Sequence, residues 1–243
     1  MCSSIFEPNF SFLEQFPDAD RHTIINSIPV AVRKLSKKLL ESEHITDADF
    51  LKVDTQGEDL FVLEGAQDVL DELIFGINIE AEFSPLYLKQ PLFSDIDIYL
   101  RSRGFQLFDM KRYYWKRKIA PEASNTKGQL AFADVLYLKT YAALRDSLKN
   151  KNAEYQRSKI LKCISICQLY GKTDYGLHLA AQAHKDGFLN DSDHTTITGS
   201  LSPKPFRLTF HGQYSLARLF HRIYLYLKSN RHYFSDEELG NEE

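Results

Sequence analysis

A short apolar run that ends in a carboxylate and a glycine turn sets the strongest limit on the fold of this chain. The stretch DFLKVDTQGEDLFVLEGA, residues 49–66, starts apolar, reaches Asp54, and turns at Gly57 into a pattern with helical spacing. Such short apolar runs are typical of strands that are buried on both faces of a parallel sheet. The stretch therefore predicts a strand, a tight turn and a helix within an α/β fold.

Length and composition suit a soluble protein of one large or two small domains. The chain has 243 residues, of which 43% are hydrophobic, and a net charge of -3. This balance gives no global attraction to nucleic acid or to an anionic membrane. Cys2, Cys163 and Cys167 are too few and too unevenly spaced for a disulfide framework, so we expect a reducing, cytoplasmic location. No run is apolar and long enough to span a bilayer.

The organisation of the chain changes near residue 140. Up to Lys139, β-like runs such as 23–32 (TIINSIPVAV) alternate with helical ones, which indicates an α/β layer. Beyond it, two helices over 153–171 and 174–187 are expected, and 200–205 is a linker. We predict an α/β domain over 1–140, a helical region over 141–234 and a frayed acidic tail over 235–243.

Asp54 stands at the carboxyl end of its predicted strand. In open parallel sheets ligands bind beyond these ends, while Gly57 supplies the conformation that a tight βα turn needs. Asp54 is therefore a candidate ligand residue. The alternative is that its side chain only caps the helix that follows, and the spacing alone does not separate the two readings.

The next predicted strand, GINIEAEF over 76–83, places two further acids near Asp54. Glu80 and Glu82 alternate with apolar residues, so they share one face roughly 6 to 7 Å apart. Because this strand follows a βα unit, it should lie parallel to the strand of Asp54. The three acids could bind a hard cation, orient a hydroxyl, or hold one proton at a raised pKa. An exposed edge strand is the other interpretation.

Four segments together carry a family resemblance: SSIFEPN, DFLKVDTQGEDLFVLEGA, IEAEFSPLYLKQPLF and RGFQLFDMKRYYWKR. Over about residues 3–139 the chain resembles the downstream half of FkbM-family methyltransferases. The resemblance implies S-adenosylmethionine as cofactor and a sugar or natural-product hydroxyl as acceptor. It places Asp54, with Gln56 in the same turn, beside the cofactor, and matches Glu80 and Glu82 to the family's acidic strand. A divalent cation is a further possibility.

The chain also departs from that family, because no glycine precedes Gly57. The glycine-rich loop and ribose acid that hold the cofactor should lie before it. We therefore expect a partial Rossmann-like methyltransferase sheet, the C-terminal half, followed by an all-helical tail. Its open edge beside Asp54 would lead to self-association or to pairing with a missing N-terminal half. S-adenosylmethionine would bind weakly or not at all. The competing interpretation is a non-catalytic remnant or interaction module.

Two further features could hold a metal or nucleic acid. Cys163 and Cys167, with His178 and His184, could face a zinc ion, but their spacing matches no common zinc motif, so a buried helical face is expected. The run MKRYYWKRK over 110–118 mixes basic and aromatic residues. Since the resemblance makes this run a strand, we expect no nucleic-acid binding.

A basic amphipathic helix is predicted from about Leu208 to Tyr233. Its apolar stripe is interspersed with Arg218, Arg222 and Lys228. Such a helix can lie on a membrane surface or dock a partner. Packing onto its own domain is the commoner arrangement, and it is the one that we expect.

Overall fold

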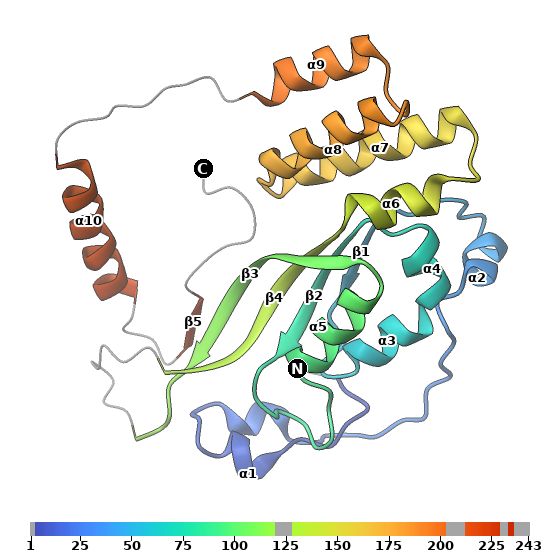
Figure 1. Cartoon of the computed structure of the whole chain (residues 1–243). Helices are drawn as coiled ribbons and strands as arrows, with labels where there is room; N and C mark the ends of the chain where they lie inside the picture. Colours follow the sequence, from blue (N-terminus) through green and yellow to red (C-terminus); the bar gives the residue numbers. More distant parts are fainter. Residues whose placement is uncertain (1–2, 120–127, 203–211, 229–232, 236–243) are drawn as a thin grey trace.

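The computed structural model describes residues 3–119, 128–202, 212–228 and 233–235. Its centre is a five-stranded sheet in the order β1-β2-β4-β3-β5 (Figure 1). The strands are β1 (Phe50–Val53), β2 (Gly76–Glu82), β3 (Phe105–Trp115), β4 (Gln129–Lys139) and β5 (Tyr233–Ser235). β1 pairs with β2 in parallel, and the other pairings are antiparallel. The predicted α/β class and the parallel pairing of the two acid-bearing strands are confirmed.

Two short helices connect β1 to β2. They are α3 (Asp59–Gly65) and α4 (Gln67–Glu72), where the sequence predicted one helix over 58–73. The break falls at Gly65 and Ala66, where glycine weakens a helix. A side chain at Gly65 would lie 3.8 Å from the Cα atom of Lys34, so the preceding segment passes close to this break. The βα unit itself is as predicted.

One face of the sheet is dry and apolar. Here β1, β2 and β4 pack against α3, α4 and α5 (Phe93–Ser102). The alternate residues Ile77, Ile79 and Ala81 of β2 are fully buried in this layer. Burial of a side chain such as Ile stabilises the fold by roughly 1.5 to 3 kcal/mol, so this face fixes which β2 residues point the other way.

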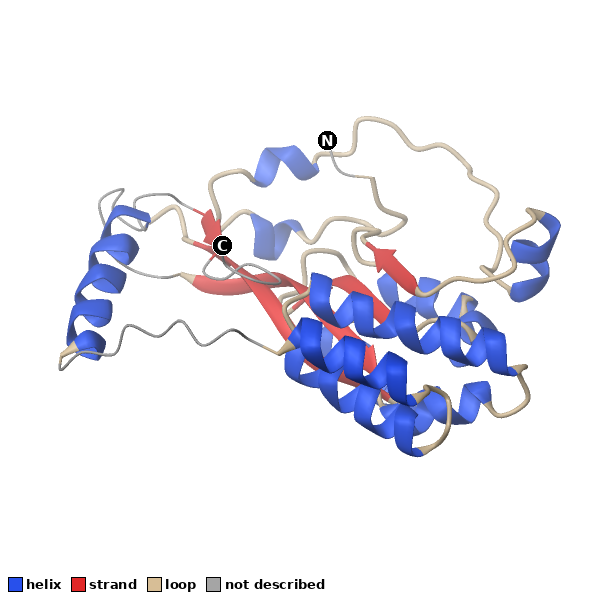
Figure 2. Cartoon of the chain, turned by 90° about the horizontal axis from the view of Figure 1, so that it is seen from above, coloured by secondary structure: helices blue, strands red, loops and turns tan. Residues whose placement is uncertain are grey.

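The opposite face is covered over only part of its length by the C-terminal helices (Figure 2). These are α6 (Tyr141–Leu148), α7 (Ala153–Leu169), α8 (Thr173–Lys185) and α9 (Asp191–Leu201). Their core includes Phe75, Leu136 and Leu138 from the sheet. The predicted α7 and α8 are confirmed, whereas α9 occupies part of the predicted linker. Cys163 and Cys167 are buried in this core, as expected for an apolar helical face.

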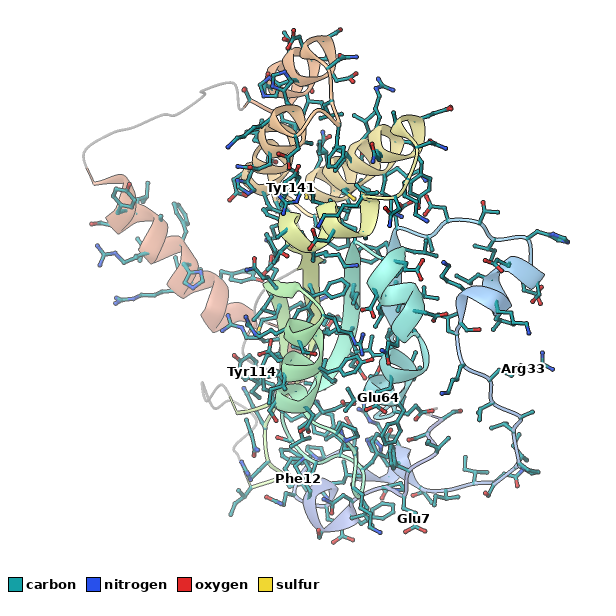
Figure 3. All side chains as sticks on the ribbon, turned by 45° about the vertical axis from the view of Figure 1, so that its right-hand side comes forward. Glu7, Phe12, Arg33, Glu64, Tyr114 and Tyr141 are labelled. Atoms are coloured by element: carbon teal, nitrogen blue, oxygen red, sulfur yellow. The ribbon has the colours of Figure 1, made fainter. Side chains whose placement is uncertain are left out.

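The N-terminal part of the chain forms α1 (Phe10–Leu13), a 3-10 helix (Ala19–His22) and α2 (Lys37–Ser42). Between the last two, the predicted strand over 23–32 is wrong. The segment is extended but pairs with no described strand, and Ile25 and Val32 are 80% and 82% exposed. Figure 3 shows this arm, marked by Arg33, standing away from the sheet. Its β-branched composition favours a strand, but no described partner meets its backbone.

Beyond α9, the predicted basic helix is present as α10 (Gln213–Lys228). The acidic tail lies outside the described residues, apart from Ser235 in β5. None of the helices in the described part of the chain is both long and apolar enough to cross a bilayer. The division into domains at residue 140 stays a prediction.

Candidate functional site

The turn after β1 is held by an acid other than the one that the sequence singled out. Asp59 is 1% exposed, and its carboxylate accepts hydrogen bonds from the backbone N–H groups of Thr55 (3.0 Å) and Gly57 (3.1 Å). Asp54 makes no such bond, since its side chain contacts Lys52 and Gln56 instead. The helix-cap interpretation of Asp54 is therefore wrong, and Asp54 is exposed and free to meet a ligand.

Gln56 adopts a strained backbone within this turn. Its φ is 57° and that of Gly57 is 102°, so two consecutive residues occupy left-handed conformations. This conformation costs a non-glycine residue about 1 to 3 kcal/mol, and it persists only where the surrounding structure holds it. A side chain at Gly57 would lie 3.1 Å from the ring of Tyr87, so the turn is closely packed. The Gln56 side chain extends from this turn to Glu80 and Tyr87.

The Gln56 amide joins β1 to the acids of β2. Its Nε2 donates to the Glu80 carboxylate at 3.0 Å and, at 3.4 Å, to Asp54. Its Oε1 accepts from the Tyr87 hydroxyl at 3.2 Å. The parallel register places Val53 opposite Ile79, so Asp54 follows directly alongside Glu80. The structure therefore brings three of the predicted site residues together: Asp54, Gln56 and Glu80.

Burial keeps both acids of β2 protonated at neutral pH. For Glu80, burial followed by repulsion from Asp54 raises the pKa to about 8. For Glu82, burial followed by repulsion from Asp59 raises the pKa to about 9. Carboxyl groups with such values are typical of functional sites, where a proton must be taken or given near neutral pH.

Glu82 differs from Glu80 in having no partner. It is 1% exposed, and both of its carboxyl oxygens are buried without a hydrogen bond within the described part of the chain. The same holds for the side-chain oxygens of Thr55 and Asn78. An unsatisfied buried polar atom costs about 1 to 3 kcal/mol, so native folds rarely retain several in one region without a function.

Two residues of this site escaped the sequence interpretation. Asp59 and Asp134 are not among the candidate residues that the sequence predicts. Asp134 pairs with Glu80 across β2 and β4, and its carboxylate accepts from the Tyr113 hydroxyl at 2.9 Å. The alternation within ADVLYLK could have placed Asp134 on one face, but only the register shows that it is the face of Glu80.

The acids are not arranged as metal ligands. Within the described residues, no group of three or more His, Cys, Asp or Glu side chains could hold a metal ion. The divalent cation that the sequence left open thus finds no ligand set there, and neither does the zinc considered at Cys163 and Cys167. Lys52 contributes a positive charge, with its Nζ 3.4 Å from Asp54.

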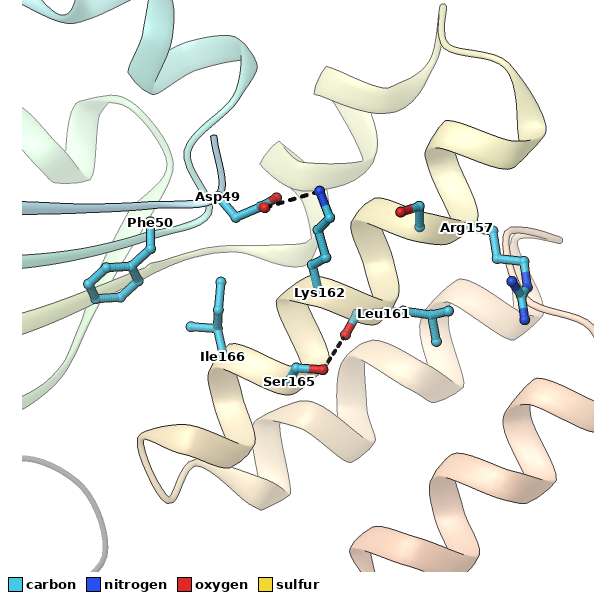
Figure 4. Close-up of a pocket in the computed structure, with 8 residues that line it drawn as sticks. Asp49, Phe50, Arg157, Leu161, Lys162, Ser165 and Ile166 are labelled. Atoms are coloured by element: carbon cyan, nitrogen blue, oxygen red, sulfur yellow. Dashed lines mark hydrogen bonds and ion pairs between the residues drawn. The ribbon is translucent and has the colours of Figure 1, made fainter. Parts of the chain in front are cut away.

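A separate hollow lies at the other end of β1. Its volume is about 570 Å³, and Figure 4 shows it between the first residues of β1 and α7. Its cations are already neutralised, because Lys162 pairs with Asp49 at 3.3 Å and Arg157 pairs with Asp193 at 2.6 Å. The hollow is therefore distinct from the acid group, which offers the richer chemistry.

Comparison with known families matches the part of the chain that contains β1 and β2. Residues 4–107 match the model of one family, described as the methyltransferase FkbM domain. The match spans β1, β2 and the acids that they carry, and it confirms the resemblance seen in the sequence. A search of curated proteins and a search of solved structures each find no match.

Proposed function

Because residues 4–107 match the model of the FkbM methyltransferase domain, we propose that this chain is an O-methyltransferase that uses S-adenosylmethionine. The acceptor would be a hydroxyl of a sugar, a glycan or a secondary metabolite. The observation that carries the proposal is the group formed by Asp54, Gln56 and Glu80 at the carboxyl ends of two parallel strands. In open α/β sheets this is where ligands bind.

Methyl transfer to a hydroxyl requires a base. As the acceptor oxygen forms its bond to the methyl carbon, the carbon–sulfur bond breaks and the hydroxyl proton must leave. A carboxylate with a pKa near neutral takes this proton efficiently. Glu80, with a pKa of about 8 and a half-buried side chain, is the proposed base. The Gln56 amide would hold the Glu80 carboxylate in place.

The side chains of the site offer hydrogen-bond acceptors to the donor groups of the cofactor and the acceptor substrate. An ammonium group or a ribose hydroxyl donates hydrogen bonds, and the exposed Asp54 carboxylate and the Gln56 carbonyl oxygen accept them. Lys52 is placed to meet a carboxylate at the same edge. The cofactor would supply the electrophilic methyl group, while these residues bind and orient it. Glu82, whose pKa burial raises to about 9, would stay protonated and keep the local charge low.

Transfer of a radiolabelled methyl group tests this function. The purified chain is incubated with labelled S-adenosylmethionine and a panel of glycans and hydroxylated metabolites, alongside Glu80→Gln and, as control, the exposed helix residue change Glu64→Gln. We expect label in an acceptor for the native chain and the control, with kcat/KM rising with pH and levelling above about pH 8. No cofactor binding in calorimetry and no labelled product would refute the proposal.

A second candidate function rests on a different observation. β1 is the last strand on its side of the described sheet, and the 23–32 segment exposes Ile24, Ile25, Ile28, Val30 and Val32. Unpaired edges and exposed apolar segments mark association surfaces. The chain would then be an interaction module that pairs with another chain. Light scattering separates the two candidates, because a monomer that methylates excludes the module, whereas an inactive oligomer supports it.

A further inference from the structure

The described side chains of helix α10 are exposed, its apolar ones included. Figures 1 and 2 both show it apart from the sheet and from α7–α9. Every described side chain from Tyr214 to Tyr224 is exposed, including Leu219 at 53% and Phe220 at 61%. The expectation that this helix packs onto its own domain is therefore wrong for its described residues. Its apolar surface needs another cover.

The exposed apolar residues form one stripe. Leu216, Leu219, Phe220 and Ile223 follow the spacing i, i+3, i+4 and i+7, which places them on one side of a helix. Arg218 and Arg222 fall on the opposite side of the same turns. With 16 residues, α10 is about 24 Å long. It is thus amphipathic, with separate apolar and basic faces.

Charge distinguishes between the surfaces that could bind the apolar face of this helix. Residues 194–235 contain six Lys or Arg and no Asp or Glu, although the whole chain carries a net charge of -3. A second copy of the helix would bring the same positive charges against it. The described remainder of the chain is acidic, yet α10 stays apart from it. Charge complementarity therefore favours an anionic surface as the cover of this helix.

We propose that α10 binds the surface of an anionic lipid bilayer. The apolar stripe would enter the boundary between headgroups and acyl chains, while Arg218 and Arg222 meet the phosphates. A lipid surface explains the stripe as well as the charge, whereas a nucleic acid would use only the basic face. The helix would lie in the plane of the surface, because no described helix can cross a bilayer. The proposal does not depend on the methyltransferase function.

Cosedimentation of the full chain with lipid vesicles tests this inference. The native chain should bind vesicles that mix phosphatidylcholine with phosphatidylserine, and it should not bind phosphatidylcholine alone. Each basic residue near an anionic surface strengthens binding roughly fivefold, so Arg218→Glu with Arg222→Glu should weaken it by about 25-fold or more. Leu219→Ser with Phe220→Ser should weaken it by more than about tenfold. Raising the salt from about 0.15 M to 1 M should release the chain.

Matched changes on other helices serve as controls. Lys38→Glu with Lys185→Glu alters two exposed lysines on α2 and α8 by the same charge, and Leu169→Ser removes a leucine of α7 that is 78% exposed. These variants should bind as the native chain does. The proposal is overturned if the native chain ignores anionic vesicles, or if the α10 variants bind as well as the controls. It is also overturned if a single-stranded oligonucleotide binds α10 while vesicles do not.

Discussion

The two ends of β1 hold carboxylates under opposite conditions. Before the strand, Asp47 and Asp49 meet Lys159, whose Nζ lies 2.8 Å and 2.6 Å from them. Although burial opposes ionisation, hydrogen bonds from Lys159, Lys162 and Tyr155 lower the pKa of Asp47 to about 2. After the strand, burial and repulsion from neighbouring carboxylates raise the pKa of Glu80 to about 8 and that of Glu82 to about 9. The carboxylates before β1 have lysine counter-charges, whereas no salt bridge joins Glu80 or Glu82 to a described residue.

The difference separates a structural cluster from a reactive one. The lysines of α7 attach the C-terminal helices to the start of the sheet, and the lowered pKa of Asp47 keeps this carboxylate ionised in the folded state. Glu80 and Glu82 have no salt-bridge partner within the described part of the chain, and their raised pKa values leave protons that a reaction can use. The site therefore costs stability that the paired end helps to offset.

The largest expected effect lies at the paired end. Lys159→Met should lower the free energy of unfolding by about 3 to 5 kcal/mol, because it leaves Asp47 and Asp49 half-buried with a weaker counter-charge. Lys162→Met is the control, since that side chain is 46% exposed and such surface pairs contribute about 1 kcal/mol or less. Urea titration measures both. Equal losses would mean that burial does not distinguish the two lysines.

At the unpaired end the main effect falls on activity. Asp54→Asn should reduce turnover at least about 100-fold, equivalent to about 2.7 kcal/mol in the activation free energy. Its melting temperature should stay unchanged, because Asp54 is exposed and Asp59 holds the turn. Methyl-transfer assays and thermal melting are run on the same samples. Native turnover in the variant would remove Asp54 from the proposed site.

The pH dependence of stability sharpens the comparison further. Between pH 6.5 and 7.5 the folded chain keeps protons on Glu80 and Glu82 that the unfolded chain releases, so stability falls as the pH rises. Each group contributes roughly 1.4 kcal/mol per pH unit. His22, whose pKa burial lowers to about 4, and Lys139, lowered by burial to about 8, add little in this window.

Glu82→Gln should roughly halve that slope, because only Glu80 then titrates differently in the two states. Glu64→Gln, a change of an exposed residue, should leave the slope as it is. Denaturant midpoints at the two pH values decide the question. A slope that is unchanged by Glu82→Gln would show that this carboxyl is ionised in the folded chain.

The sequence predicted the βα unit, the parallel pairing and the acids because these depend on local spacing. Because successive side chains of a strand point to opposite faces, Glu80 and Glu82 share one face of β2, and Ile77 lies on the other. It could not predict that Asp59, and not Asp54, accepts the hydrogen bonds that hold the turn, since both acids lie within reach of it. Nor could it place the 23–32 segment, whose β-branched residues favour a strand only where a partner strand is present.

The smallest effect concerns the amide that joins the two strands at the reactive end. Gln56 and His44 both have left-handed backbones, with φ of 57° and 60°, but His44 is exposed and remote from the acids. His44→Gly should raise the free energy of unfolding by roughly 0.5 to 1 kcal/mol, because glycine relieves the strain. Gln56→Gly gains the same relief but loses the hydrogen bonds to Glu80 and Tyr87, worth about 1 kcal/mol each. Its net change should therefore be lower by about 1 to 2 kcal/mol, and equal changes in both variants would show that the amide bridge does not hold the acids together.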